Sequence, residues 1–246
     1  MHRLRSIGIV GLTIALCIGI LLGGAIPGQA FDFKKEKILS KAAVFSKNGV
    51  VSCSNTMASR VGVKILEEGG NAFDAAIATA LTLNAVEPSM CGIGGASFWL
   101  IWNAKEKTLY ALDAGTQAPV AATPDKFADR SELLSGLKAM GIPGNVAAYF
   151  AVLKRFGTMP FEKVMQPSLR YLEEGFVLTQ RGYANFSAAA AQVPVLFPNL
   201  ARVYAPEGAW PPAGSLMKNP DLARTLRTLA KEGPDAFYKG SIAKAM

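Results

Sequence analysis

The stretch Gly69-Gly70-Asn71-Ala72-Phe73-Asp74-Ala75-Ala76 decides how the first part of the fold is built. Gly69 and Gly70 end one helix, since glycine adopts the left-handed conformation without steric cost. Asn71 caps a second helix, because its short polar side chain accepts a hydrogen bond from an unpaired backbone N–H. Asp74, at the third helical position, supplies the acidic half of a capping box and suits the positive end of the helix. The stretch therefore predicts two helices joined by a tight turn.

These two helices differ in the faces that they bury. Asn55 or Thr56 caps the first helix, in which apolar residues between Ala58 and Leu66 recur at helical spacing and form one apolar face. The second helix, Ala75 to Ala85, is rich in Ala, Leu and Thr and carries no charge. A helix that is apolar all round is expected to be buried on all sides. Pro88 ends it.

Apolar segments on both sides of this helix pair predict strands. Val50 to Ser52 forms a strand candidate before it. After it, Cys91-Gly92-Ile93-Gly94-Gly95 is a turn whose glycines let another chain approach closely. Ala96–Trp102 and Thr108–Leu112 then predict a hairpin, and its first strand is expected to be buried on both faces. The glycines follow a helix and precede a strand, which excludes a dinucleotide-binding fingerprint.

Further helices are predicted beyond the hairpin. They span Val146–Phe156, Phe161–Leu172, Thr179–Ala190 and, capped by Asn219, Pro220–Lys231. Pro167 is expected to break the second of these in two, because proline cannot donate a hydrogen bond and clashes with the preceding turn. The segment Pro194–Pro212 holds five prolines and is predicted to be a loop.

The N-terminus has the pattern of a secretory signal peptide over residues 1–30. Arg3 and Arg5 precede an uncharged apolar run, Ile7 to Leu22, and small residues end at Ala30. We expect cleavage before Phe31 and export to the periplasm or the cell exterior, with residues 31–246 as one domain. An uncleaved signal would instead be a membrane anchor, since its apolar run is close to the length that spans a bilayer.

Composition excludes several kinds of site. The formal charge of +8 is scattered among acidic residues, which argues against nucleic-acid binding. His2 is the only histidine and lies in the signal, so the remainder cannot form a Ser-His-Asp or Cys-His arrangement by itself. Cys53 and Cys91 could pair after export or remain buried thiols, and spacing leaves this open. No metal-ligand spacing is present, and neither a metal nor a cofactor is expected.

Six ordered motifs resemble the gamma-glutamyltranspeptidase family and cover nearly everything after residue 45. They are residues 69–76 in the helix pair from Asn55 to Asp74, Glu87-Pro88-Ser89-Met90, Gly92-Ile93-Gly94-Gly95, residues 141–147 (GIPGNVA), residues 156–160 (FGTMP) and residues 233–240 (GPDAFYKG). The resemblance implies an α/β (α+β) fold, the four-layer α/β/β/α sandwich of the N-terminal-nucleophile hydrolases. The chain would form an incomplete sandwich, the N-terminal part of the large subunit.

The resemblance also implies the chemistry. Family members attack amides with an N-terminal threonine freed by self-cleavage, whose own α-amine serves as the base. No catalytic residue is therefore expected before Met246, and a small subunit from the same precursor would supply the nucleophile. The large subunit contributes an arginine that binds the α-carboxylate of a γ-glutamyl group, as in glutathione. In the matching stretch, Asp113 to Pro119, Gly115 occupies the position of this arginine.

Three functions follow as hypotheses. The first is an exported hydrolase or acyltransferase acting on glutathione or related γ-glutamyl compounds. The second is a family acylase for a non-glutamyl amide. Gly115 leaves two explanations open, a different acyl substrate or a substrate carboxylate held by another arginine. The third is a non-catalytic fragment that keeps the fold without the nucleophile.

Overall fold

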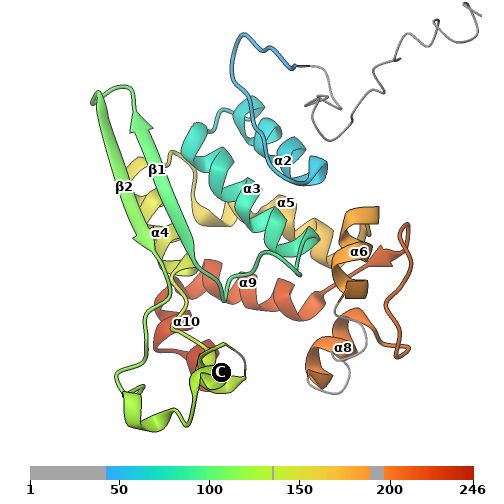
Figure 1. Ribbon diagram of the computed structural model, residues 1–246. Coiled ribbons are helices and arrows are strands. Elements are labelled where there is room, and N and C mark those ends of the chain that lie inside the picture. The colour runs from blue at the N-terminus through green and yellow to red at the C-terminus, as the bar shows by residue number, and fades with distance from the viewer. Residues whose placement is uncertain (1–42, 135, 189–196) are drawn as a thin grey trace, which may run out of the picture. The chain divides into compact units, whose positions relative to one another are not determined.

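The uncharged helix after Asn71 lies at the centre of the fold in the computed structural model, which describes residues 43–134, 136–188 and 197–246. This helix, α3 (Ala72–Val86), packs against α2 (Thr56–Glu67), α4 (Asn145–Phe156) and α5 (Phe161–Glu173) (Figure 1). Ile77, Ala78 and Leu81 have no exposed surface. All these elements belong to one compact unit, residues 46–246, and the predicted signal lies outside the described residues.

The predicted start and end signals of the first two helices are confirmed. The Asn55 side chain accepts from the backbone N–H of Met57 at 2.9 Å and caps α2. Gly69, after the end of α2, has a φ of +89°, as a left-handed helix end requires. Asn71 accepts from the backbone N–H of Phe73 and Asp74, and the Asp74 carboxylate accepts from that of Asn71 at 2.9 Å. The capping box is therefore complete.

The strand predicted at residues 50–52 is wrong. This segment has no regular secondary structure and pairs with no strand among the described residues. Its contact with the fold is made by side chains instead. A Cβ on Gly62 of α2 would lie 2.7 Å from the Val51 side chain and 2.4 Å from Thr79 Oγ1. Val51 thus occupies the space that a side chain at position 62 would need.

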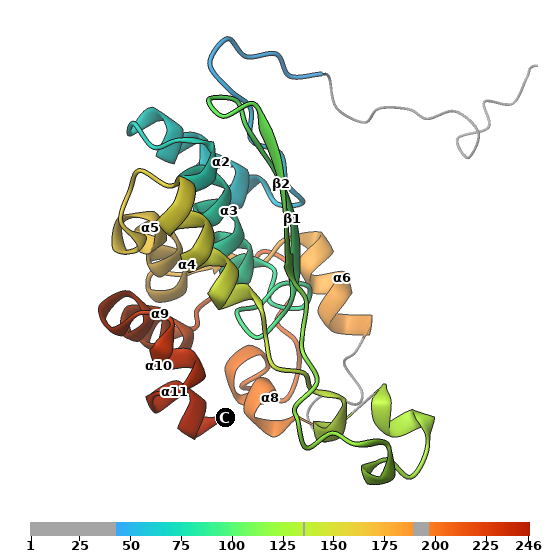
Figure 2. The ribbon, with the colours of Figure 1, turned by 90° about the vertical axis from the view of Figure 1, so that its left-hand side faces the viewer.

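The predicted hairpin is confirmed, but its burial is not. Strands β1 (Ser97–Asn103) and β2 (Thr108–Ala114) pair antiparallel, and Ile101 is buried on the face toward the helices. Phe98 and Leu100 point the other way and are 78% and 80% exposed. Figure 2 shows the hairpin edge-on, with α3 and α4 on one side of it. The described helices cover only one face. Cover for the other face would have to come from outside the described residues, so burial of the strand on both faces stays a prediction.

Pro167 does not break the fifth helix. Helix α5 runs without interruption from Phe161 to Glu173 with Pro167 inside it. The carbonyl that would have accepted from residue 167 belongs to Lys163, whose residue is exposed and can be hydrated. Val164 and Leu169 on the same helix are almost completely buried. Their burial offsets the lost hydrogen bond.

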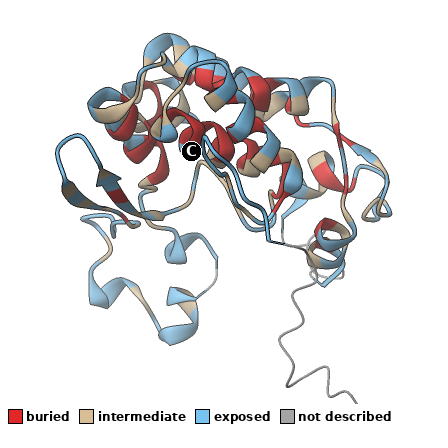
Figure 3. Ribbon diagram, turned by 90° about the horizontal axis from the view of Figure 1, so that it is seen from above, coloured by how far each residue is buried: buried red, intermediate tan, exposed pale blue. Residues whose placement is uncertain are grey.

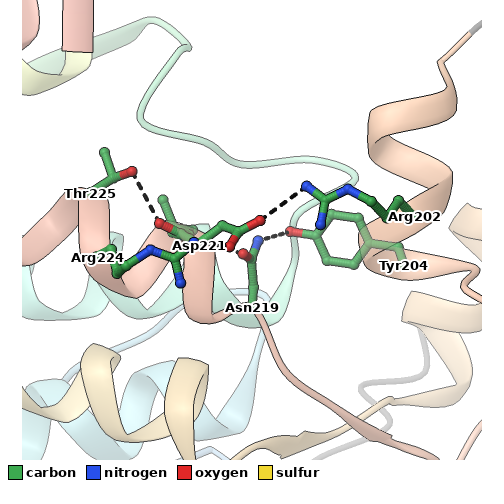
Figure 4. Close-up of polar contacts among 7 residues, drawn as sticks. Arg202, Tyr204, Asn219, Asp221, Arg224 and Thr225 are labelled. Carbon is green, nitrogen blue, oxygen red and sulfur yellow. Dashed lines mark hydrogen bonds and ion pairs between the residues drawn. The ribbon is translucent and has the colours of Figure 1, made fainter. Parts of the chain in front are cut away.

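The proline-rich segment is only partly a loop. Residues 198–204 form α8 (Pro198–Tyr204), while residues 194–196 lie outside the described residues. Asn219 Nδ2 donates to the buried Tyr204 hydroxyl at 2.8 Å, and Asn219 also caps α9 (Pro220–Glu232), as predicted. Arg202 pairs with Asp221 at 3.1 Å (Figure 4). Proline at its first helical position leaves α8 intact, because that N–H would be unpaired in any case.

The remaining elements are short. They are β3 (Phe176–Val177) paired with β4 (Leu216–Met217), α6 (Gln180–Ala188), α10 (Asp235–Tyr238), α11 (Ser241–Ala245), and three 3₁₀ turns at Pro124–Lys126, Arg130–Leu133 and Leu137–Ala139. The predicted helix at 179–190 is confirmed as far as Ala188. Residues 116–134 between the hairpin and α4 are largely exposed (Figure 3). No helix within the described ranges is long and apolar enough to cross a membrane.

Asp74 joins two parts of this fold. Its carboxylate has no exposed surface and also accepts from Thr158 Oγ1 at 2.6 Å and from the backbone N–H groups of Thr158 and Met159 at 3.0 and 3.2 Å. Asn71 Nδ2 donates to the Phe156 carbonyl at 2.6 Å. A Cβ on Gly157 would lie 2.9 Å from Asp74 Oδ1, so glycine permits this approach. The start of α3 is thus bonded to the link between α4 and α5.

We expect Asp74→Ala to destabilise the protein by about 3 kcal/mol or more, because it leaves several buried donors unpaired. Urea unfolding followed by circular dichroism measures the change. Asp235→Ala is the matched control, because Asp235 is exposed and pairs only with Lys239 on the surface. Equal effects of the two substitutions would contradict this role of Asp74.

Candidate functional site

The base of the hairpin gathers the glycine turn and Gly115 at one place. Ser97 pairs with Ala114, so the residues before β1 and after β2 lie at the same end of the hairpin. The glycine turn closes through a hydrogen bond from the Gly95 N–H to the Gly92 carbonyl at 3.1 Å. The glycine turn and Gly115 are about twenty residues apart in sequence, and they therefore lie next to each other at the base of the hairpin.

The N-terminal end of α4 packs closely against this base. A Cβ on Gly144 would lie 2.1 Å from the Ala114 carbonyl oxygen, so only glycine fits there. Gln117 and Ile142 exchange backbone hydrogen bonds of 3.1 and 2.8 Å beside it. The Tyr238 hydroxyl donates to the Pro143 carbonyl at 2.7 Å and accepts from the N–H of residue 147. The motifs at 141–147 and 233–240 thus hold each other at the hairpin base.

Gly115 lies at the edge of a groove of about 350 Å³ between β2 and α4. Its N–H donates to Asp113 Oδ1 at 2.8 Å, and a Cβ would lie 2.9 Å from that oxygen and 3.6 Å from Phe98. Its φ is outside the left-handed region, so the backbone itself does not demand glycine. No arginine, lysine or histidine is among the described residues that line the groove. The predicted site residue is therefore partly exposed, and the groove beside it is lined by one carboxylate, that of Asp113, and by no cation among the described residues.

A second groove, of about 250 Å³, lies beneath the glycine turn. Asn145 Nδ2 donates to the Gly92 carbonyl at 2.8 Å, and Asn84 Nδ2 donates to the Tyr149 hydroxyl at 3.1 Å. Burial raises the pKa of the Tyr149 hydroxyl to about 12. Burial, together with the nearby Glu87 and Cys53, also raises the pKa of the Cys91 thiol. The groups facing this groove are thus uncharged at neutral pH.

Cys53 and Cys91 are free thiols and partly buried. Cys53 Sγ lies 3.1 Å from both the Asn55 carbonyl and Ser59 Oγ. Within the described ranges, no group of three or more His, Cys, Asp and Glu side chains is arranged to hold a metal ion.

Comparison with known proteins agrees with the motifs. The model of the family described as Gamma-glutamyltranspeptidase matches residues 58–246. The chain belongs to the gamma-glutamyltranspeptidase family. It is 33% identical over 251 residues to the glutathione hydrolase proenzyme of Bacillus subtilis (strain 168). This match covers 96% of this chain and 41% of the relative. The corresponding Escherichia coli (strain K12) proenzyme is 32% identical over 98% of this chain and 42% of the relative. The chain thus spans about two-fifths of these relatives.

Solved structures of the family have the same fold. The chain matches Helicobacter pylori gamma-glutamyltranspeptidase with a TM-score of 0.77 and 31% identity, over 83% of this chain and 60% of that one. It matches a cephalosporin acylase from Bacillus halodurans with a TM-score of 0.76 and 30% identity, over 87% and 41% of the two chains. The predicted α/β fold class of the N-terminal-nucleophile hydrolases is confirmed. The described residues contribute the β1–β2 hairpin and the helices packed on it.

Asn84, Asn145 and Tyr149 are site residues that the sequence reasoning missed. All three are nearly buried. Asn84 is a polar residue inside an otherwise apolar helix, which was an available signal. Asn145 and Tyr149 are one helical turn apart, but this spacing is equally typical of any apolar helix face. Sequence alone gave no sign that both reach the glycine turn.

We expect the stability that Tyr149 contributes to fall as the pH rises above 10. Between about pH 10 and 12 the unfolded chain's tyrosine is ionised while the folded one is protonated, so the unfolded state binds fewer protons. The free energy of unfolding should then fall by up to about 1.4 kcal/mol per pH unit from this group. Urea unfolding of the wild type and Tyr149→Phe at pH 8, 10 and 11 measures it. A difference between the two that does not change with pH would contradict the prediction.

Proposed function

We propose that this chain is part of an amide hydrolase or acyltransferase whose nucleophile, an N-terminal threonine freed by self-cleavage, lies outside the 246 residues. The observation that carries this proposal is the family match over residues 58–246. An N-terminal threonine uses its own α-amine as base, so this mechanism requires no histidine from residues 3–246. The acyl group passes to the threonine hydroxyl, the amine leaves, and water or an amine acceptor releases the acyl group.

The substrate class follows from the relatives and from Gly115. Glutathione and related γ-glutamyl compounds are the first candidates, since curated relatives are glutathione hydrolases. A non-glutamyl amide is the second candidate. It is favoured by the groove beside Gly115, where the family resemblance places a carboxylate-binding arginine but the described lining holds no Lys, Arg or His. A cephalosporin acylase among the solved structures is similar to 87% of this chain.

The proposed partner is a small subunit from the same precursor. The outer face of the hairpin, formed by Phe98, Leu100, Trp102 and Leu109, is more than half exposed at each residue. An apolar patch of this kind is typical of an interaction surface. We also propose that the protein is exported, on the pattern of residues 1–30. The Lys and Arg residues are scattered, and nucleic acid is not a proposed partner.

Residues 31–246 by themselves should have no amidase or transpeptidase activity, because the proposed nucleophile is outside them. Turnover of a γ-glutamyl anilide by this purified polypeptide should equal that of buffer. The control is the full-length protein, which should turn over an amide substrate. A rate from residues 31–246 that disappears on heating would contradict the prediction. A folded full-length protein that neither cleaves itself nor turns over an amide would instead favour the non-catalytic alternative.

Gly115→Arg should raise kcat/KM for glutathione in the full-length protein by about tenfold or more, since hydrogen bonds between charged groups contribute about 1.5–3 kcal/mol. The new side chain requires Asp113 to rotate, because its Cβ would lie 2.9 Å from Asp113 Oδ1. Gly115→Ala is the matched control, since it makes the same displacement without a guanidinium. Equal gains from both variants would show that the arginine's charge plays no part.

A further inference from the structure

Two glycines of the turn before β1 are not explained by the rest of the chain. A Cβ on Gly94 would meet no described atom within 4 Å, and one on Gly92 would meet only the Gly94 nitrogen at 3.9 Å. Neither residue has a φ in the left-handed region. Gly95 differs, because its Cβ would lie 3.2 Å from Asn145 Nδ2. Glycine at 92 and 94 therefore leaves open backbone, which is what close approach of a ligand requires.

The groove beneath this turn contains an acceptor that is not used. Asn145 is 6% exposed, and its Oδ1 is buried and has no hydrogen-bond partner among the described residues. The orientation of the amide is fixed by the other end, since Nδ2 donates to the Gly92 carbonyl. A buried oxygen without a donor costs free energy, and a ligand that supplies an N–H removes that cost.

The same groove contains a donor that is not used. The Tyr149 hydroxyl accepts from Asn84 Nδ2, and no hydrogen bond that it donates is found within the described ranges. Burial keeps this hydroxyl protonated well above neutral pH. Tyr149 follows Asn145 by one helical turn, and both residues line the groove from one side of α4.

The walls of the groove select an uncharged ligand. Leu83, Trp99 and Met90 give it apolar surface, and none of its lining residues is Lys, Arg, Asp or Glu. A charged group would lose its hydration there without an opposite charge to replace it. A ligand that fits must be neutral and must offer one N–H and one carbonyl oxygen on the same side.

We propose that this groove binds the primary carboxamide of a small molecule, with an N–H donated to Asn145 Oδ1 and the carbonyl oxygen accepting from Tyr149. A primary carboxamide presents its oxygen and one N–H on the same side. A trans backbone amide presents them on opposite sides, which argues against a peptide segment of the protein's own precursor. The inference rests on the proposed function for the choice of an amide over other neutral groups.

The test is binding of propionamide to the full-length protein whose nucleophile has been replaced, so that turnover plays no part. Trp99 lines the groove and stacks edge-on against Tyr149 at 6.2 Å between ring centroids, so its indole N–H resonance reports on occupancy. Propionamide should shift this resonance saturably. Propionate and propylammonium are charged probes of similar size, and N-methylacetamide is the trans amide; all three should bind more weakly.

Tyr149→Phe should weaken propionamide binding by about 3–10-fold, the loss of one neutral hydrogen bond. Tyr171→Phe on α5 is the matched control and should leave it unchanged. An unperturbed Trp99 resonance in the unliganded variants shows that they are folded. The proposal is overturned if propionamide gives no saturable shift, if propionate or N-methylacetamide binds equally well, or if Tyr149→Phe has no effect. Failure of the wild type to cleave any amide would refute the proposed function without altering this binding result.

Discussion

The buried carboxylate of Asp74 is the interaction on which the rest of the structure depends. A charge in the protein interior is tolerated only when its lone pairs are used, and here the donors come from two places. One is the first turn of α3, and the other is the link at Thr158 and Met159 that follows α4. The end of α4 is therefore fixed to the beginning of α3. Because a helix is a stiff rod with a rise of about 1.5 Å per residue, this attachment also fixes the start of α4, where Asn145 lies.

The start of α4 matters because the hairpin base leaves no room for adjustment. Gly144 is in contact with the Ala114 carbonyl, and any larger residue would push the strand away from the helix. The capping interaction at one end of α4 and the backbone contact at the other thus determine where the glycine turn and Gly115 are held. Helix α4 thus connects the buried Asp74 carboxylate to the glycine turn, where Gly92 and Gly94 leave open backbone. Helix α4 therefore supports the glycine turn and Gly115 rigidly, although both are partly exposed.

Local signals in the sequence were sufficient for the elements that have them. Asn71, Asp74 and Gly69 act within a few residues of themselves, and their roles as caps and helix end could be predicted from propensity alone. Pro167 was misjudged because the burial of Val164 and Leu169 outweighs a lost hydrogen bond, and burial is a property of the tertiary structure. The apolar run of β1 likewise does not say which elements cover its outer face, because that too is a property of the tertiary structure. Asn145 and Tyr149 were missed because their partners, Gly92 and Asn84, are more than fifty residues away in sequence.

The hairpin base and the outer helices differ in the charged side chains that they carry. Ion pairs such as Glu173 with Arg227, at 2.7 Å between α5 and α9, lie on exposed helix surfaces, where they contribute little to stability. The two grooves at the hairpin base contain no cation among their described lining residues, and the groups of the groove under the glycine turn are neutral. In such surroundings a hydrogen bond between neutral groups is stronger than in water, while an unpaired charge is costly. A carboxylate on a substrate would therefore find no compensating charge in the described lining of either groove.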